Sequence, residues 1–500
     1  MSLRRNVIAN YLGAGWAALM NIAFVPIYIR YMGAEAYGLV GVFLVLQGML
    51  SLLDLGMAPS IGREMARINL EHDAADARTL LRTVEWVVLA LAGAVVLFVA
   101  VLAPWLATSW LHLERVPEPV AVHSIMLMGG IVGLRLIENV YRSALVGLQR
   151  QVALNMVLAF AATLRGAGSW WVLASISAGA SAFFSWQLLV ACLSVALFAW
   201  AVYRQLPSAA ARAGFSPAKL HAVKRFAGGV MLITGMALLL SNLDKVLLSR
   251  LLPLDVFGRY TFAATIAQAP LGLVVPIVQA FYPRLTRYWA EREGGQLAGA
   301  YHLCAQLVSV MMGSAAMFVV LYGRQALRLW TGDVALADSV YAITAVLTVG
   351  TMLNGMMTVP YYLQLSAGWT SLMARANAIA VLLMIPALLV LVPTYGAIGA
   401  ASAWLALNSA YVLLIVPLMH RKLLAGERVG WYVRDVAIPL AASLIVGGLL
   451  RPLLESGTRA PLSQWIGLFL AGGSMLAASA MAAPLVRGRV EALLRSRVHR

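Results

Sequence analysis

The sequence predicts an all-α polytopic membrane protein with about 14 transmembrane helices, and three observations lead to that fold class. Hydrophobic residues make up 62% of the 500 residues and charged residues only 11%, whereas soluble domains are roughly 45–50% apolar and about 25% charged. Apolar runs long enough to cross a bilayer, roughly 20 residues, recur along the chain. The second half also repeats features of the first. We therefore expect two parallel six-helix lobes followed by two further helices.

The apolar runs define the predicted spans in chain order. The first run starts close to the N-terminus but is too long for a signal peptide. No small-residue cleavage site precedes the loop near Tyr31, so we predict that this run is a membrane helix. The predicted limits are 7–32, 37–62, 84–111, 120–147, 152–176, 180–203, 226–252, 256–283, 301–325, 337–365, 370–393, 396–420, 433–452 and 462–486.

Lysine and arginine residues predict the orientation of these spans. Loops on the side that holds both termini carry 26 of the 37 basic residues, and three more lie within spans. The positive-inside rule therefore predicts cytoplasmic termini. Basic loops beside anionic lipid explain the net charge of +17 better than nucleic-acid binding does. The opposite side holds eight arginines, namely Arg30, Arg115, Arg250, Arg259, Arg324, Arg328, Arg451 and Arg459.

Matching positions in the two halves predict an internal repeat at an offset of 220 residues. The matches include charged and aromatic-glycine positions: Arg30 with Arg250, Glu35 with Asp255, Tyr37-Gly38 with Phe257-Gly258, and Tyr141 with Tyr361. Both halves start on the cytoplasmic side, so we expect parallel repeats related by an axis along the membrane normal. Some secondary transporters have this arrangement, with the substrate site between the repeats.

A segment rich in Pro, Ala, Gly and Ser separates the repeats and predicts a linker. We therefore predict that the chain has four parts. They are a six-helix N-terminal lobe at 1–203, a cytoplasmic linker at 204–225, a six-helix C-terminal lobe at 226–420, and two extra transmembrane helices with a basic cytoplasmic tail at 421–500.

Three charged residues in the fourth predicted span share one helical face. Arg135, Glu138 and Arg142 follow an i, i+3, i+7 spacing. One interpretation is a structural ladder in which Glu138 neutralises both arginines. The other is a cavity lining with net positive charge for an anionic ligand, because the planar arginine fork binds phosphate oxygens in pairs. In that interpretation Glu138 is also a candidate for ion or proton coupling.

Arg165 lies near the middle of the fifth predicted span and has no acidic residue in its own helix. A lone arginine at membrane depth needs another helix, water or a ligand as its partner. Gly166 and Gly168 follow it and permit close packing or bending of the helix. We therefore predict that Arg165 belongs to a substrate cavity.

Asp244 and Lys245 stand side by side near the far end of the seventh predicted span. Neighbouring helical residues do not share a face, so we expect that they do not simply neutralise one another. Asp244 either takes up a proton or pairs with an arginine of another helix. Lys245 is a candidate substrate contact, although pairing or snorkelling to the surface are alternatives.

Two further charged residues lie near predicted cytoplasmic ends of spans. Asp54, in the second span, is a candidate for ion coupling or for a local ion pair with Arg63. Arg375, in the eleventh span, is a candidate for substrate binding, and contact with lipid headgroups is the alternative.

The sequence lacks the patterns that mark several classes of enzyme and cofactor site. The chain has no Gly-Lys dipeptide and therefore no Walker A loop, and it has no H-E-x-x-H, G-x-S-x-G or D-x-D string. Neither the two cysteines nor the seven histidines show metal-ligand spacing. No predicted loop opposite the cytoplasm is long enough for an active site. We therefore predict a transporter without a metal or cofactor rather than an enzyme.

Three segments of the sequence resemble a known family. The segments are NYLGAGWAALMNIAFVPIYIRYMGAEAYGLVGVF from Asn10, LLDLGMAPSIGREMAR from Leu52, and NLDKVLLSRLLPLDVFGRYTFA from Asn242. They resemble the polysaccharide-biosynthesis membrane proteins, or Wzx-type oligosaccharide flippases, a family of the multidrug/oligosaccharidyl-lipid/polysaccharide (MOP) exporter superfamily.

The resemblance implies a MATE-like fold in the bacterial inner membrane and an undecaprenyl-diphosphate-linked oligosaccharide as substrate. It further implies ion-coupled alternating access. Partners would be the lipid-linked substrate, membrane lipids and a glycan polymerase with its export machinery. A lipid II flippase, a drug or cation antiporter of the same superfamily, and a membrane glycan polymerase or ligase are the alternatives.

Overall fold

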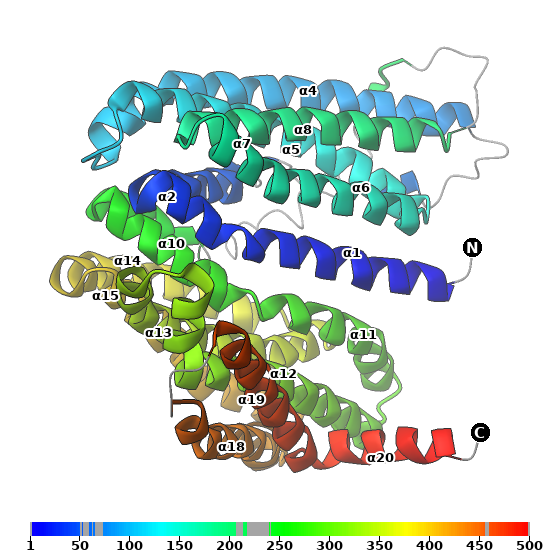
Figure 1. The fold of residues 1–500 in the computed structure, drawn as a ribbon. Coiled ribbons are helices and arrows are strands. Elements are labelled where there is room, and N and C mark those ends of the chain that lie inside the picture. The colour runs from blue at the N-terminus through cyan, green and yellow to red at the C-terminus, as the bar shows by residue number, and fades with distance from the viewer. Residues whose placement is uncertain are drawn as a thin grey trace. The chain divides into compact units, whose positions relative to one another are not determined.

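The computed structural model is helical along nearly all of the chain that it describes. The described residues are 3–50, 53, 60–62, 64–65, 74–206, 214–217, 240, 242–455 and 460–498. Over these ranges the only β-type pairing is an isolated bridge between His112 and Pro253, so the all-α prediction is confirmed. The chain forms two compact units, an N-terminal unit at Met1–Thr261 and a C-terminal unit at Phe262–Arg500 (Figure 1).

The N-terminal unit is built largely from long helices. In it α5 lies between α4 and α8, and α1 packs along α6 (Figure 1). The elements are α1 (Leu3–Ala23), α2 (Val25–Leu50), α4 (Ala74–Trp105) with a π-helical turn η2 (Leu106–Trp110), α5 (Glu118–Gly147), α6 (Gln151–Thr163) with a π-helical turn η3 (Leu164–Gly168), α7 (Ser169–Ser175), α8 (Ala180–Tyr203), helical residues 242–251 and the start of α10 (Leu254–Gln268).

The C-terminal unit is organised around α12, which contacts α11, α13, α18 and α19. At 38 residues, α12 is the longest helix, and at 1.5 Å per residue it spans about 57 Å. The elements of the C-terminal unit are α11 (Leu271–Ala290), α12 (Gly294–Thr331), α13 (Val334–Ser366), α14 (Ser371–Tyr395), α15 (Ala397–Ala410), η4 (Tyr411–Ile415), α16 (Val416–Leu423), α17 (Arg428–Gly430), η5 (Trp431–Ala437), α18 (Ile438–Glu455), α19 (Pro461–Ala482) and α20 (Pro484–Val498).

Twelve helices of the described residues are long and apolar enough to cross a membrane. They correspond in order to twelve of the fourteen predicted spans. The predicted span 7–32 coincides with α1 and the first turns of α2. The predicted span 226–252 is described only at 240 and 242–252. Of the predicted linker at 204–225, only 204–206 and 214–217 are described, so the boundary between the lobes stays a prediction.

Gly33 separates the first two predicted spans. Its backbone, with φ of 83° and ψ of 162°, is non-helical and interrupts α2. A side chain at this φ is strained, so glycine suits the position. The chain therefore turns at the point where the apolar run was predicted to end.

The repeat-related glycines Gly38 and Gly258 form a close helix-helix contact inside the N-terminal unit. A Cβ on Gly258 would strike the carbonyl oxygen of Ala34, and a Cβ on Gly38 would strike that of Leu254. Ala34 and Leu254 are themselves 220 residues apart. The two contacts therefore exchange when each residue is replaced by its repeat equivalent, as two-fold symmetry requires. The parallel-repeat arrangement thus shows in atomic detail between α2 and α10.

We predict that Gly258→Ala destabilises the protein, because the new methyl group has no space beside Ala34. Overpacking of this kind typically costs about 1–3 kcal/mol. Thermal melting of the purified protein in detergent measures the effect. The matched control is Gly299→Ala on α12, where a Cβ meets nothing within 4 Å. Equal melting temperatures for the two variants would contradict the close contact.

Candidate functional site

The charged ladder on α5 is anchored by one buried carboxylate. An Arg135 guanidinium nitrogen donates to Glu138 Oε2 at 2.9 Å, and the Ser194 hydroxyl on α8 donates to the same oxygen at 3.1 Å. Arg142 lies 3.7 Å from Glu138 Oε1. The Glu138 side chain is 1% exposed, whereas those of Arg135 and Arg142 are 20% and 39% exposed. The ladder therefore neutralises one charge internally and retains one positive charge at its partly open side.

Arg165 lies in the π-helical turn η3, which divides the fifth span. Its side chain is partly exposed. Across the described residues, no acidic side chain forms an ion pair with it. Turns of this type leave backbone groups without their ordinary helical partners and are frequent at functional sites. Arg165 is therefore a positive charge at membrane depth that the described part of the fold does not neutralise.

Aromatic side chains from two other helices fix the backbone around Arg165. The Tyr28 hydroxyl on α2 lies 3.2 Å from the carbonyl oxygens of both Arg165 and Gly166. The Trp186 indole on α8 donates to the carbonyl of Leu164 at 2.8 Å. These donors supply the hydrogen bonds that carbonyls at membrane depth require.

The glycines after Arg165 provide room for the same aromatic rings. A Cβ on Gly166 would lie 2.7 Å from the Phe24 ring, and a Cβ on Gly168 would overlap the Trp186 ring. Gly166 and Gly168 were expected to permit close packing or bending, and the structure shows the close packing. The arrangement holds the main chain under Arg165 in one conformation.

Asp244 and Lys245 are both buried, and they contact each other directly. Lys245 Nζ lies 3.5 Å from Asp244 Oδ1, and the Tyr260 hydroxyl on α10 donates to Asp244 Oδ2 at 2.6 Å. The expectation that these neighbours do not neutralise one another was wrong. The long lysine side chain folds back across the helix surface, which a spacing rule based on Cβ positions does not consider.

The two remaining predicted site residues are Arg375 and Asp54. Arg375 lies in the second turn of α14 and is exposed. Asp54 lies outside the described residues. The roles of both residues stay predictions.

A buried carboxylate that the sequence analysis missed lies on α4. Glu85 Oε1 accepts hydrogen bonds from the hydroxyls of Tyr141 on α5 and Tyr203 on α8, at 2.8 and 2.7 Å. Arg82 lies 3.2 Å from Glu85 Oε2 and covers the Tyr203 ring. The sequence could have identified Glu85, because it is an acidic residue at the start of the third predicted span. Its contacts hold α4, α5 and α8 together.

A second missed cluster joins α12 to the helices that follow the two repeats. His302 on α12 binds the carboxylate of Asp435 through Nδ1, and its Nε2 lies 3.0 Å from Glu427 Oε2. Gln306 donates to Asp435 Oδ1 at 2.9 Å and accepts the Leu485 N–H at 2.9 Å. His302 and Asp435 fall inside predicted spans, so a search for ionisable residues in all spans would have found them.

The described site residues of the N-terminal unit include three guanidinium groups, those of Arg135, Arg142 and Arg165. Glu138 contacts Arg135 and Arg142, and Asp244 contacts Lys245. Over the described residues no cluster of three or more His, Cys, Asp or Glu side chains is placed to hold a metal ion. Guanidinium groups bind phosphate oxygens through paired hydrogen bonds. The chemistry of the unit therefore suits phosphate binding.

Solved structures with a similar fold are transporters. An inward-facing MATE-family multidrug transporter of the MOP superfamily has 14% sequence identity and a TM-score of 0.61, with 96% of each chain covered. The lipid II flippase MurJ, in an inward closed conformation, has 11% identity and a TM-score of 0.70, covering 95% of this chain and 98% of its own. A MOP superfamily transporter from Pyrococcus furiosus has 15% identity and a TM-score of 0.60, covering 83% and 94%. At these identities the likeness establishes the MOP fold alone.

Family assignment comes from the sequence itself. No curated protein sequence matches the chain. Residues 3–289 match the family described as "Polysaccharide biosynthesis protein". This match covers more than half of the chain and includes the segments on which the resemblance was based. With its MOP transporter fold, the chain therefore belongs to the polysaccharide biosynthesis protein family.

Proposed function

We propose that this protein is a flippase for an undecaprenyl-diphosphate-linked oligosaccharide. The substrate would be a repeat unit of O-antigen, capsule or exopolysaccharide, moved from the cytoplasmic to the periplasmic leaflet of the bacterial inner membrane. Family membership and the MOP fold support transport in polysaccharide biosynthesis. The observation that carries the choice of substrate class is Arg165, a positive charge at membrane depth with no acidic partner within the described residues.

A lipid-linked diphosphate is chemically suited to Arg165. The guanidinium group stays charged at any relevant pH and presents a planar fork of donors to phosphate oxygens. The π-helical turn and the hydrogen bonds from Tyr28 and Trp186 fix the backbone that carries it. A preorganised donor binds an anion at a lower entropic cost than a flexible one. Arg135, Arg142, Lys245 and Arg375 are the further candidate contacts.

Transport would follow alternating access between the two repeats, coupled to an ion gradient. Glu138, Asp244 and Asp54 are the candidate coupling groups. Asp244 suits this role because one of its oxygens accepts the Tyr260 hydroxyl while the other contacts Lys245. Protonation of Asp244 would remove the negative charge beside Lys245 and so change the electrostatics of this pair.

A lipid II flippase is the second candidate, favoured by the fold similarity to MurJ. Its substrate carries the same diphosphate, so Arg165 fits either. A drug or cation antiporter suits the site less, because the charges of Arg135, Arg142 and Arg165 would repel a cation. A glycan polymerase or ligase is the alternative from the enzyme class. A deletion strain separates these possibilities.

We predict that deleting the gene causes lipid-linked oligosaccharide to accumulate on the cytoplasmic leaflet, because no other step moves it outward. Digestion of spheroplasts and of inverted vesicles with a glycan hydrolase shows which leaflet holds it. Single repeat units that reach the periplasm but stay unpolymerised would favour a polymerase. An arrest of cell-wall synthesis with normal glycan export would favour a lipid II flippase.

We predict that Arg165→Ala loses most glycan export, roughly tenfold or more, while the protein still inserts in the membrane. The loss of charge-assisted hydrogen bonds to phosphate accounts for this magnitude. Surface polysaccharide per copy of membrane-inserted protein is the measurement. Arg487→Ala is the matched control, because Arg487 pairs with Glu491 within α20 and is not one of the candidate site residues. Normal polysaccharide in the Arg165→Ala strain would remove Arg165 from the site.

A further inference from the structure

A buried histidine of the C-terminal unit lies between two carboxylates. His302, on α12, contacts Asp435 of η5 through Nδ1, and its Nε2 lies 3.0 Å from Glu427 Oε2. The side chains of His302 and Asp435 are 4% and 0% exposed, whereas that of Glu427 is 40% exposed. The group thus reaches from the protein surface at Glu427 to the interior at Asp435. None of these three residues belongs to the candidate transport site.

The two contacts of His302 together require a protonated ring. An ionised carboxylate only accepts hydrogen bonds, and a neutral imidazole has one N–H group and one lone pair. In a neutral ring, one nitrogen would therefore present its lone pair to a negatively charged oxygen. The imidazolium form has an N–H group on both nitrogens and can donate to Asp435 and Glu427 at once. The placement of His302 is accordingly suited to a bound proton.

The ring is a better place for this proton than the buried carboxylate. Imidazole is roughly a hundredfold stronger as a base than a carboxylate. The Gln306 amide nitrogen donates to Asp435 Oδ1 at 2.9 Å, and the Gln306 amide oxygen accepts the Leu485 N–H. A proton on Asp435 Oδ1 would therefore meet a donor instead of an acceptor. On His302 the same proton takes part in a hydrogen bond between opposite charges, which is the stronger kind.

A bound proton also balances the charges of the site. Arg434, on η5, is the fixed cation, and its Nε lies 3.8 Å from Asp435 Oδ1. With a proton on His302, two positive groups face two carboxylates. Without it, Arg434 alone faces Asp435 and Glu427. Since Asp435 is fully buried, the loss of a positive neighbour is costly there.

A second histidine lies close to this site and is bound elsewhere. The His420 ring, on α16, lies 5.5 Å from the Tyr301 ring, which is itself 5.5 Å from the His302 ring. His420 Nδ1 donates to the Val416 carbonyl at 2.9 Å, so this nitrogen does not compete for either carboxylate. Further ionisable groups on α12 and on the elements packed against it are Cys304, Tyr432, the Arg287–Glu291 pair of α11 and the Arg487–Glu491 pair of α20.

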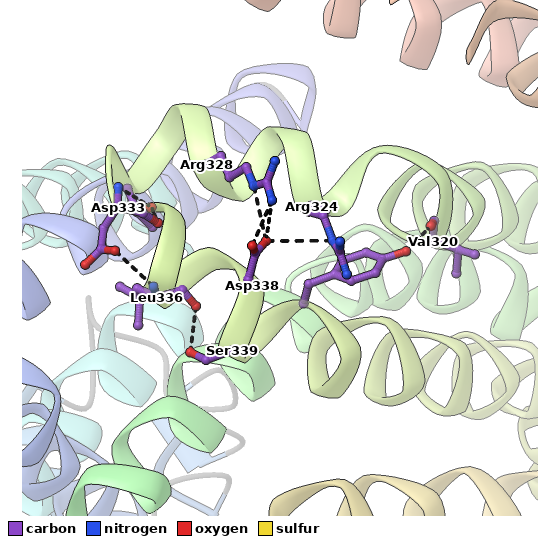
Figure 2. Close-up of polar contacts among 9 residues, drawn as sticks. Val320, Arg324, Arg328, Asp333, Leu336, Asp338 and Ser339 are labelled. Atoms are coloured by element: carbon purple, nitrogen blue, oxygen red, sulfur yellow. Dashed lines mark hydrogen bonds and ion pairs between the residues drawn. The ribbon is translucent and has the colours of Figure 1, made fainter. Parts of the chain in front are cut away.

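The polar contacts at the other end of α12 are of a different kind. Figure 2 shows Arg324 and Arg328 turned toward the carboxylate of Asp338 on α13. Arg328 donates to both Asp338 oxygens at 2.8 and 2.9 Å. Arginine keeps its charge at every relevant pH, so these contacts do not take up or release a proton near neutrality. Histidine changes its charge between about pH 5 and 8, and the contacts of His302 therefore depend on pH.

We propose that His302, Asp435 and Glu427 form a site that binds one proton and, while the proton is bound, fastens η5 and the start of α17 to α12. The proton reaches the site through Glu427, the exposed member. Its loss leaves a lone pair against a carboxylate and weakens the attachment of the helices that follow the predicted second repeat. The site is separate from the candidate transport site and does not depend on the proposed function.

NMR of protein labelled with nitrogen-15 at histidine tests this proposal, because the nitrogen shifts separate an imidazolium from a neutral ring. His302→Gln identifies the His302 signal by its absence. We expect an imidazolium in the wild-type protein at about pH 7. In Glu427→Gln the amide suits a neutral ring as well as a charged one, so His302 binds its proton roughly tenfold or more weakly.

Asp338→Asn is the matched control for Glu427→Gln. The Asp338 side chain is 38% exposed, close to the 40% of Glu427, and it contacts the other end of α12. Its loss leaves arginines that stay charged, so we expect the titration of His302 to be unchanged.

Melting temperatures provide a second readout. A proton held more tightly in the folded protein than in the unfolded chain stabilises the protein at low pH, and this stabilisation is lost as the pH rises. We therefore expect the melting temperature of the wild-type protein to fall between about pH 6 and 9. The fall is smaller in Glu427→Gln and unchanged in Asp338→Asn.

Three results would overturn the proposal. The first is a neutral His302 ring in the wild-type protein at about pH 6. The second is an equal proton affinity in wild-type protein and Glu427→Gln, and the third is an equal loss of affinity in Asp338→Asn. If His302→Gln does not fold, the His302 signal is the one whose titration moves in Glu427→Gln, and a spectrum in which no histidine moves contradicts the site.

Discussion

The close contact between α2 and α10 is the constraint on which the N-terminal unit depends. Two helix backbones approach this closely only where side chains are absent, and Gly38 and Gly258 supply those gaps. Gly41 extends the contact, because a Cβ there would strike the Thr261 hydroxyl, again 220 residues away. The reciprocal pattern makes the contact a property of the repeat. It also explains why aromatic-glycine pairs mark the same position in both halves of the sequence.

Buried charge in this protein is mostly satisfied by hydrogen bonds between helices. Glu85 accepts hydrogen bonds from two tyrosines, and Glu138 accepts hydrogen bonds from an arginine and a serine. Asp244 accepts one from Tyr260. The Glu35 carboxylate accepts hydrogen bonds from the backbone N–H groups of residues 114–116, and these bonds fix the position of the loop after η2. Each pairing removes the large cost of an unpaired buried charge. Arg165 departs from this pattern, because no acidic side chain of the described residues forms an ion pair with it, and for that reason it supports the functional proposal.

Much of the fold was predictable because membrane helices obey simple rules of length and hydrophobicity. Twelve predicted spans match helices, and the turn at Gly33 falls between the first two predicted spans. The basic segment Pro484–Val498, predicted only as a tail, forms α20. This helix contains no apolar run of spanning length, so a search for spans does not detect it.

The candidate site was less predictable because pairing depends on three-dimensional contacts. Arg165 stood out in the sequence as a charge without an acid in its own helix. The Asp244–Lys245 contact was missed because it depends on the reach of one side chain. Glu85 and the His302–Asp435 pair were missed because their partners lie on helices far away in sequence. The π-helical turn beneath Arg165 has no sequence signature beyond its two glycines.

The most direct measurement is flipping by the purified protein in vesicles. A fluorescent undecaprenyl-diphosphate oligosaccharide is placed in the membrane, and a membrane-impermeant glycan hydrolase reports which leaflet holds it. The account predicts that substrate crosses the membrane only in vesicles that contain the protein, and that a labelled neutral phospholipid does not cross. Transport of a cationic dye without any movement of the lipid-linked oligosaccharide would contradict it.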